Sequence, residues 1–280
     1  MLGSIEIDAD RLADDIRTSS ALEFGDPYIE FNCGHPWKSC MIWAGGGETG
    51  DGILINYDNS LPCLPTANGR KLPYVQEMIE RYFTVEHLLY GRLVIMSNNV
   101  LIPHRDYREF AGRPADQKAA HRLHIPLDTT PDALFMAGSA IYRMRVGEIW
   151  SLDVTELHSA AVLSDYRRLH LILDFAEVEH QADLVTFDFD ESTGIPENSL
   201  ATRPELTRSA QDAILGMSGL ITMDNYMDVF GIVIKKQFRA TTGESYAWDT
   251  MREISDLSGN PEIVARTKEF YEHCVRRPGE

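Results

Sequence analysis

The sequence predicts a mainly β protein with helices near both ends of the chain. From residue 91 to about residue 177, short apolar runs such as LVIMS, RLHIPL and LHLILDF recur between turn residues. Short strands at close and regular spacing are typical of a β sandwich or barrel. From residue 203 onward, the apolar residues follow a helical period instead. We therefore expect a β core, an N-terminal α/β segment that wraps it, and a C-terminal helical bundle.

The N-terminal segment mixes strand, helix and turn signals. Residues 3–7 are predicted to form a strand, and residues 9–18 a short amphipathic helix. Residues 40–60 carry several glycine turn signals and are predicted to be a loop. Residues 72–90 are predicted to form a second helix, because Pro73 suits a first turn and apolar residues then recur along one helical face. These apolar residues are Val75, Met78, Ile79 and Tyr82.

The C-terminal part shows helix start signals after a polar, acidic stretch at residues 178–202, which is predicted to be a loop. Helices are predicted to open at Pro204, to span residues 218–230, and to begin at Ser245. Another helix is predicted after Asn260, because asparagine suits an N-cap and the proline that follows suits the first helical position.

Length, composition and charge limit the classes of protein that are possible. With 280 residues, the chain is expected to form a β domain with its N-terminal wrapping over residues 1–200 and a helical domain over residues 201–280. The formal net charge of -17 argues against nucleic acid or an anionic membrane as a partner. No apolar run is long enough to span a bilayer, and the acidic N-terminus lacks a signal pattern. The 4 cysteines are irregularly spaced, which indicates a reducing cytoplasm rather than a disulfide framework.

The residues His104, Asp106 and His158 form the most informative pattern in the chain. Two imidazoles and one carboxylate are the ligand set that holds non-haem Fe(II) and leaves coordination positions open. In an extended strand, residues i and i+2 point to the same side, so His104 and Asp106 can reach one metal while Arg105 points away. Pro103 suggests a sheet edge or a bulge at this point. Two unrelated surface histidines are the alternative interpretation.

Two predicted strands carry arginine and histidine on one face and aliphatic residues on the other. Arg122 and His124 share a face of RLHIPL, and Arg168, His170 and Asp174 share a face of RLHLILDF. These polar faces are expected to line the metal cavity, with a water-exposed sheet as the alternative. Arginine in a buried site favours a carboxylate, which a 2-oxo acid and an amino-acid substrate would supply. Each histidine is a candidate contact for the 2-oxo acid or forms a structural hydrogen bond.

Several longer segments carry a resemblance to a known family. They are LGSIEIDADRLADD near the start of the chain, IPHRDY at 102–107, RLHIPLDT at 122–129, RMRVGEIWSLD at 143–153, HSA at 158–160 and RLHLILDFA at 168–176. The match continues more loosely through SYAWDTMREIS at 245–255. The sequence resembles the bacterial free-proline hydroxylases of the cis-3 and cis-4 types. These belong to the aspartyl/asparaginyl β-hydroxylase-like group of Fe(II)/2-oxoglutarate dioxygenases.

The resemblance implies a double-stranded β-helix core (jelly-roll or cupin-like) and a role for individual residues. It implies His104, Asp106 and His158 as iron ligands, and Arg168 as the partner of the distal carboxylate of 2-oxoglutarate. Arg122 resembles the arginine that holds the substrate carboxylate, and Arg92 resembles a further pocket arginine. The pairs Trp37-Lys38 and Ile42-Trp43 match tryptophan-containing pairs of proline 3-hydroxylase, which makes Trp43 a candidate substrate contact.

The resemblance also implies a reaction and its cofactors. The expected activity is hydroxylation of a ring carbon of a free cyclic L-amino acid by Fe(II), 2-oxoglutarate and O2, giving succinate and CO2, with ascorbate as a reductant in vitro. The segment Phe135-Met136-Ala137-Gly138 replaces a more polar stretch of the family and is a candidate part of the substrate pocket. The substrate is therefore left open between L-proline and the larger ring of L-pipecolic acid, and the hydroxylated carbon is not assigned.

Other functions are compatible with the same residues. The chain could hydroxylate another free amino acid or a peptide Asp or Asn side chain, or be a non-catalytic jelly-roll binding protein. A zinc hydrolase would need a general base beside the metal, for which Glu148 and Glu156 are the candidates. The expected partner is a small amino-acid substrate, and a homodimer is left open.

Overall fold

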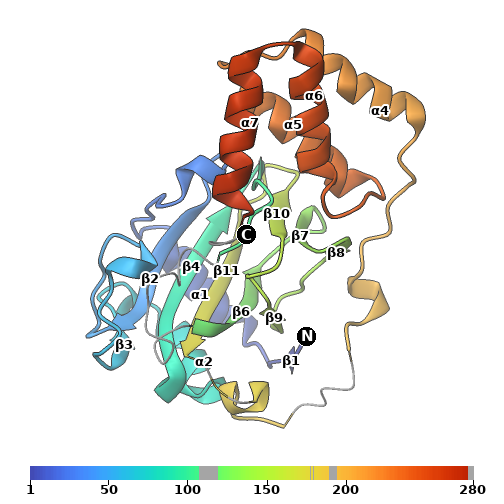
Figure 1. Ribbon diagram of the computed structural model, residues 1–280. Helices are drawn as coiled ribbons and strands as arrows, with labels where there is room; N and C mark the ends of the chain where they lie inside the picture. Colours follow the sequence, from blue (N-terminus) through green and yellow to red (C-terminus); the bar gives the residue numbers. More distant parts are fainter. Residues whose placement is uncertain (107–118, 177, 179, 189–193, 277–280) are drawn as a thin grey trace.

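The computed structural model describes residues 1–106, 119–176, 178, 180–188 and 194–276, and the fold is mainly β, as the sequence predicts (Figure 1). The last residue of the 102–107 motif lies outside these ranges. Two antiparallel sheets form the centre of the molecule. The larger sheet contains, in spatial order, β1 (Gly3–Ser4), β9 (Glu148–Leu152), β6 (Ala119–Asp128), β11 (Arg168–Ala176), β4 (Leu88–Met96), β2 (Lys38–Gly45) and β3 (Cys63–Pro65). The smaller sheet contains β5 (Asn99–Val100), β10 (His158–Val162), β7 (Ala133–Ala137) and β8 (Ala140–Tyr142).

Helices precede and follow the strands along the chain. Those described are α1 (Ala9–Ser19), α2 (Pro73–Tyr82), α4 (Arg208–Leu215), α5 (Tyr226–Arg239), α6 (Tyr246–Ser258) and α7 (Pro261–Cys274). Figure 1 shows α5, α6 and α7 together beyond one end of the sheets, while α1 and α2 lie against the large sheet. No helix in the described part of the chain combines the length and the hydropathy that a membrane span requires.

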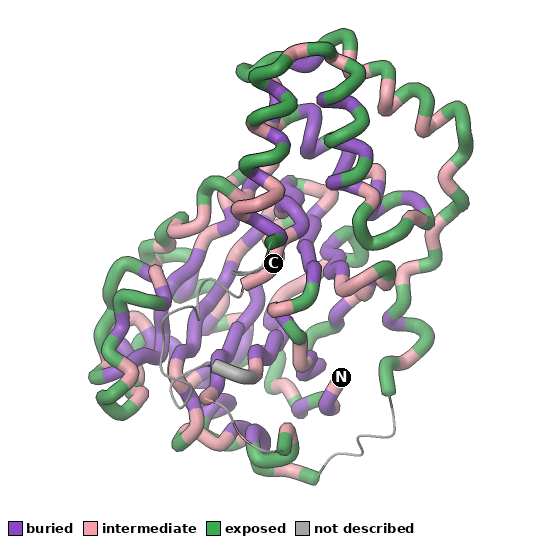
Figure 2. Tube along the Cα trace, in the orientation of Figure 1, coloured by how far each residue is buried: buried purple, intermediate pink, exposed green. Residues whose placement is uncertain are grey.

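The large sheet has one apolar face and one polar face in its central strands. Leu123, Leu171 and Leu173 are buried in a core that also contains the apolar face of α2. The residues that alternate with them, among them Arg122 and Arg168, face the space between the two sheets. This alternation follows from the period of two in a strand and agrees with the prediction from the sequence. Figure 2 shows the central strands buried and the exposed positions on the outer sides of the helices.

The small sheet and the C-terminal helices share a second core. Leu134, Met136 and Ala161 from the small sheet are buried in one cluster with Phe230 and Trp248 of α5 and α6. Burial of apolar side chains is the main stabilising contribution to such a contact. The helices are therefore packed directly on the sheet that carries His158.

Two predicted elements of the N-terminal part differ in the structure. The helix predicted over residues 72–90 ends at Tyr82, because Phe83 is extended and its ring is buried, 6.4 Å from that of Phe175. The loop predicted over residues 40–60 begins instead with β2. Seven of the eight residues of β2 are buried, so no alternation of polar and apolar residues marked it as a strand.

Two of the C-terminal helices, α4 and α5, begin later than predicted, whereas α6, with Ser245 at its N-cap, and α7 begin where predicted. The predicted helix at 218–230 is α5, which starts only after Asn225 exchanges hydrogen bonds with Thr222. The helix predicted to open at Pro204 is α4, which begins after the N-cap Thr207. The start of α7 agrees with the prediction, because the Asn260 side chain accepts a hydrogen bond from the backbone N–H of residue 262 at 2.9 Å.

Candidate metal centre and its cavity

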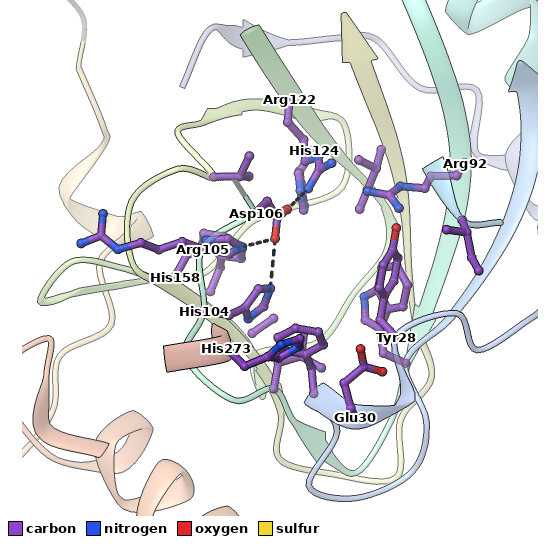
Figure 3. Close-up of a pocket in the computed structure, with 18 of the residues that line it drawn as sticks. Tyr28, Glu30, Arg92, His104, Arg105, Asp106, Arg122, His124, His158 and His273 are labelled. Atoms are coloured by element: carbon purple, nitrogen blue, oxygen red, sulfur yellow. Dashed lines mark hydrogen bonds and ion pairs between the residues drawn. The ribbon is translucent and has the colours of Figure 1, made fainter. Parts of the chain in front are cut away.

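A cavity of about 240 Å³ lies between the two sheets and holds most of the predicted site residues. Its wall includes the three predicted metal ligands and four arginines, together with apolar residues from both sheets (Figure 3). The segment of residues 28–31 and the end of α7 close it from the outside. A polar site enclosed by apolar walls is the usual form of a small-molecule site.

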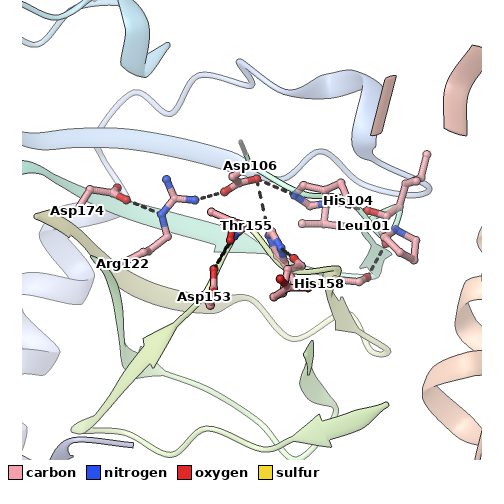
Figure 4. Close-up of polar contacts among 12 residues, drawn as sticks. Leu101, His104, Asp106, Arg122, Asp153, Thr155, His158 and Asp174 are labelled. Carbon is pink, nitrogen blue, oxygen red and sulfur yellow. Dashed lines mark hydrogen bonds and ion pairs between the residues drawn. The ribbon is translucent and has the colours of Figure 1, made fainter. Parts of the chain in front are cut away.

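His104, Asp106 and His158 converge on one point of this cavity. The candidate ligand atoms of the three residues all lie within 4.8 Å of one another. Oδ1 of Asp106 is 3.3 Å from Nε2 of His104 and 3.7 Å from Nε2 of His158 (Figure 4). Two imidazole nitrogens and one carboxylate oxygen on the same side of a site fit Fe(II) with open positions.

The other ring nitrogen of each histidine is held by the backbone. Nδ1 of His104 lies 2.6 Å from the carbonyl oxygen of Ile102, and Nδ1 of His158 lies 2.9 Å from that of Glu156. A protonated Nδ1 that donates to a carbonyl leaves the lone pair on Nε2, which then faces the metal position. The two histidines also exchange both backbone hydrogen bonds, at 3.0 Å each.

The histidine and aspartate of the motif do not lie in a regular strand. β5 ends at Val100, and His104 forms an isolated bridge to His158. This agrees with the break that Pro103 suggested and corrects the simple strand geometry. Arg105 does point away from the metal position, since its guanidinium donates to the carbonyl of Thr155 and pairs with Glu156.

The charges of the ligands suit a cation. Burial by itself would raise the pKa of Asp106, but Arg122 and the two histidines together lower it well below its ordinary value. Burial, and after it the nearby His104, lowers the pKa of His158 to about 4. At neutral pH the carboxylate is therefore ionised and His158 is neutral, which are the states that bind a metal.

Arg122 links the metal ligand to a buried carboxylate. Its NH1 donates to Oδ2 of Asp106, and its Nε donates to Oδ1 of Asp174 at 2.5 Å (Figure 4). NH2 of Arg92 lies 3.6 Å from Oδ2 of the same Asp174, which is fully buried. Nε and NH1 of Arg92 have no hydrogen-bond partner among the described residues. Both predicted substrate arginines thus lie side by side, with Asp174 behind them.

Arg168 is the least compensated charge of the cavity. It is 2% exposed and makes no ion pair or hydrogen bond within the part of the chain that the structure describes. Burial lowers its pKa to about 10, so it is still charged at neutral pH. A buried guanidinium without a counterion is costly unless a ligand supplies an anion.

The remaining predicted contacts fall in different places. His124 lines the cavity, whereas His170 is buried behind it, 6.1 Å from the His124 ring. Trp43 lies elsewhere, in the core between the large sheet and α2, and the tryptophan that lines the cavity is Trp37. Phe135 of the predicted pocket segment does line the cavity and stacks on His158, with ring centres 6.0 Å apart.

Residues near the mouth of the cavity were not predicted from the sequence. Phe31 lies between two imidazoles, 4.8 Å from the ring of His104 and 5.9 Å from that of His273. Tyr28 and Glu30 lie beside it in the wall. None of these residues belongs to a recognisable spacing pattern, because three separate segments meet here only in the folded chain.

The two carboxylates that the sequence offers as general bases for a zinc hydrolase, Glu148 and Glu156, are not in the cavity. Glu148 accepts hydrogen bonds from the backbone of Arg145 and from Nε1 of Trp150, and Glu156 pairs with Arg105. Neither carboxylate is part of the cavity wall in the described structure. The ligand set, the open positions beside it and the uncompensated arginine are instead those of an Fe(II)/2-oxoglutarate-dependent dioxygenase, and the chain is an enzyme of that class.

Comparison with known proteins gives the family. The family model described as aspartyl/asparaginyl beta-hydroxylase matches residues 4–177, and the model described as L-proline 3-hydroxylase, C-terminal, matches residues 183–278. The chain belongs to the aspartyl/asparaginyl β-hydroxylase family, and within it to the branch that contains the L-proline cis-hydroxylases.

Individual relatives cover nearly the whole chain. An L-proline cis-4-hydroxylase of Rhizobium meliloti (strain 1021) is 32% identical over 95% of this chain and 91% of its own length. L-proline cis-3-hydroxylase 2 of a Streptomyces species is 29% identical over 98% of this chain and 94% of its own length. A solved 2OG-Fe(II) oxygenase family oxidoreductase from Burkholderia pseudomallei overlaps 61% of this chain and 80% of its own, at 11% identity and a TM-score of 0.41, which is too distant to bear on the assignment.

Proposed function

We propose that the protein hydroxylates a ring carbon of a free cyclic L-amino acid, either L-proline or L-pipecolic acid, and converts 2-oxoglutarate to succinate and CO2. The observation that carries this proposal is the uncompensated, buried Arg168 beside a second arginine pair, Arg92 and Arg122. Two separate cationic sites next to one metal position suit two different carboxylate ligands. The names of the relatives supply the substrate class, since they are L-proline hydroxylases.

His104, Asp106 and His158 would hold the iron, which fits the donor set and its orientation. When bound, Fe(II) supplies the activation of O2 that is coupled to oxidation of 2-oxoglutarate. Ascorbate is the reductant that we expect to sustain activity in vitro. The protein contributes position, because the C–H bond that lies nearest the metal decides which carbon reacts.

Arg168 is proposed to bind the distal carboxylate of 2-oxoglutarate. Its planar guanidinium pairs with both oxygens of a carboxylate and so fixes the direction in which the cosubstrate lies. Burial also lowers the pKa of His124 well below its ordinary value, so this wall residue contributes a neutral imidazole. A contact of His124 or His170 with the cosubstrate stays a prediction.

Arg122 and Arg92 are proposed to bind the substrate carboxylate. Arg122 pairs with Asp106 and Asp174, and beside it Nε and NH1 of Arg92 have no hydrogen-bond partner among the described residues, so Arg92 would supply the donors that the ligand needs. Phe135, Trp37 and Ile172 provide the apolar wall for a carbon ring. An apolar wall distinguishes one added methylene by only about 1–3 kcal/mol, so proline and pipecolic acid are close competitors.

The finer description of the fold follows from the same assignment. We propose that the two sheets form the double-stranded β-helix core of this family, with α1 and α2 covering one side and α4 to α7 forming a C-terminal helical domain from about residue 201. The four cysteines are unpaired, which supports a reducing compartment such as the cytoplasm. The oligomeric state, for which the sequence leaves a homodimer open, is determined by sedimentation of the purified protein.

The proposed function is tested with purified protein, Fe(II), ascorbate and 2-oxoglutarate against a panel of free cyclic amino acids and of peptides containing Asp or Asn. The expected result is the gain of one oxygen by a cyclic amino acid with one succinate formed per product, measured by mass spectrometry. His104→Ala and Asp106→Ala should abolish turnover and the Fe(II)–2-oxoglutarate charge-transfer band. Oxidation of peptides alone would replace the proposed substrate, and a wild-type protein without the band would remove the metal assignment.

A further inference from the structure

Glu30 is an acidic residue of the cavity wall with no assigned role. It lies in the middle of the short 3-10 turn Ile29–Phe31, and its carboxylate points into the cavity (Figure 3). Of the described residues that line the cavity, only Glu30 and Asp106 carry a carboxylate. Asp106 is committed to the metal position and to Arg122. Glu30 forms no ion pair with any described residue, so its charge is available to a ligand.

The backbone that carries Glu30 is fixed relative to the metal position, although the side chain is exposed. Nδ2 of Asn32 donates to the carbonyl oxygens of Tyr28 at 3.0 Å and of Ile29 at 3.3 Å, which holds the turn. The carbonyl oxygen of Phe31 accepts a hydrogen bond from the backbone N–H of Ile102 at 2.9 Å. The Phe31 ring contacts His104 at 4.8 Å. The carboxylate therefore extends from a rigid point close to a metal ligand.

The positions of the charged residues in the cavity favour one orientation of the bound substrate. Arg92, Arg122 and Arg168 are all buried in the inner wall, where they attract carboxylates. A free amino acid that enters with its carboxylate toward Arg92 and Arg122 carries its protonated nitrogen on the neighbouring carbon. The ring of Trp37 in the cavity wall already lies 5.6 Å from the Arg92 guanidinium, which disfavours a second cation on that ring.

We infer that Glu30 binds the protonated ring nitrogen of the substrate and thereby selects free cyclic amino acids over acids and peptides whose nitrogen is uncharged or absent. This inference rests on the proposed function and names the group that recognises the cationic end of the zwitterion. A carboxylate–ammonium contact gives such discrimination because it pairs two opposite charges, whereas the nitrogen of a peptide bond carries no charge.

The test compares Glu30→Gln with the wild type and with Glu23→Gln, an exposed glutamate outside the cavity that serves as the matched control. Substrates are L-proline, L-pipecolic acid and tetrahydrofuran-2-carboxylic acid, in which a ring oxygen replaces the nitrogen. Glu30→Gln should raise KM for the amino acids about tenfold and change KM for 2-oxoglutarate by less than about twofold. It should also remove most of the wild-type preference for the amino acids over the ring-oxygen acid, and Glu23→Gln should behave as wild type.

The outcomes separate this inference from the proposed function. If the wild type hydroxylates a cyclic amino acid and Glu30→Gln does so with unchanged KM and unchanged preference, the role of Glu30 is wrong and the function stands. If the wild type acts on peptides or on the ring-oxygen acid but on no free amino acid, both are wrong. Equal increases of KM for 2-oxoglutarate and for the amino acid would also contradict the assignment, since they would indicate general damage to the cavity.

Discussion

Trp248 donates a hydrogen bond from its indole Nε1 to the backbone carbonyl oxygen of Pro103, 2.9 Å away. Pro103 directly precedes the metal-ligand candidate His104. Trp248 follows Pro103 by 145 positions in the chain. The backbone N–H of Arg105 donates in turn to the carbonyl of Cys274, at the end of α7. The C-terminal helices therefore hold the segment 103–106 at two points, although none of the three candidate ligands comes from them.

Trp248→Phe should weaken iron binding as well as stability. The variant leaves the Pro103 carbonyl without its donor and removes part of a ring that is 1% exposed, so the free energy of unfolding should fall by about 2–4 kcal/mol. Fe(II) affinity, measured by titration of the charge-transfer band, should also fall. Phe238→Leu is the control, because Phe238 is buried in the same core and is not the residue that donates to Pro103. A loss of stability with wild-type iron affinity in both variants would contradict the positioning role.

Arg168→Met should stabilise the ligand-free protein and raise KM for 2-oxoglutarate. Burial lowers the pKa of Arg168 to about 10, which corresponds to a desolvation cost of about 3 kcal/mol. An apolar side chain of similar length avoids that cost, so unfolding of the apoprotein should require about 1–3 kcal/mol more. KM for 2-oxoglutarate should rise more than about tenfold, far more than KM for the amino acid. Arg167→Met, at a residue outside the cavity, is the control for both measurements.

Asp174→Asn should impair binding of the amino acid more than binding of 2-oxoglutarate. Asp174 is fully buried and pairs with Arg122 and Arg92, the two proposed anchors of the substrate carboxylate. Loss of its charge leaves two buried guanidiniums undercompensated, which should cost about 3 kcal/mol of stability. Steady-state kinetics should show a raised KM for the amino acid, and denaturant unfolding gives the stability. A raised KM for 2-oxoglutarate alone would show that Asp174 supports the 2-oxoglutarate site and not the substrate site.

Stability should fall with acid partly through two buried histidines. Burial, together with nearby arginines, lowers the pKa of His124 and His170 well below 6.5. The unfolded chain therefore takes up protons below about pH 6.5 that the folded protein does not, and the loss continues toward the lower folded pKa. Between about pH 7.5 and about pH 5.5, each histidine should contribute about 1 kcal/mol to this loss. His170→Asn should show a shallower dependence in unfolding experiments, and an unchanged dependence would contradict a neutral, buried His170.

The sequence predicts the apolar and the polar face of β6 and β11, because the alternation of side chains along a strand depends only on neighbouring residues. Leu123 and Leu171 face the apolar core, and Arg122 and Arg168 face the cavity, as predicted. By contrast, β2 gave no such signal because both of its faces are buried. The helix beginning at Pro73 was predicted too long because its apolar spacing continues past Tyr82, whereas the buried Phe83 and the pairing of β4 end it.

In the candidate site, too, some residues are predicted correctly from the sequence and others are not. The spacing of two positions pairs His104 with Asp106, and the sequence makes His158 the best-placed distant histidine. The structure brings the three within 4.8 Å. The prediction for Trp43 rests on a motif match alone, and Trp43 lies in the core between the large sheet and α2. The prediction is wrong because a motif match identifies a strand but does not show which face of that strand lines the cavity.

The sequence by itself determined the mainly β core, the face of each arginine strand, the start of α7 and the identity of the metal-ligand candidates, since these depend on residues that are close together or carry a distinctive chemistry. Only the tertiary structure decided that Trp248 supports the metal segment, that Asp174 lies behind Arg92 and Arg122, and that Glu30 and Phe31 reach the same cavity. Such contacts join segments that are far apart in the chain. They are set by how the two sheets and the C-terminal helices pack, which no local pattern of residues records.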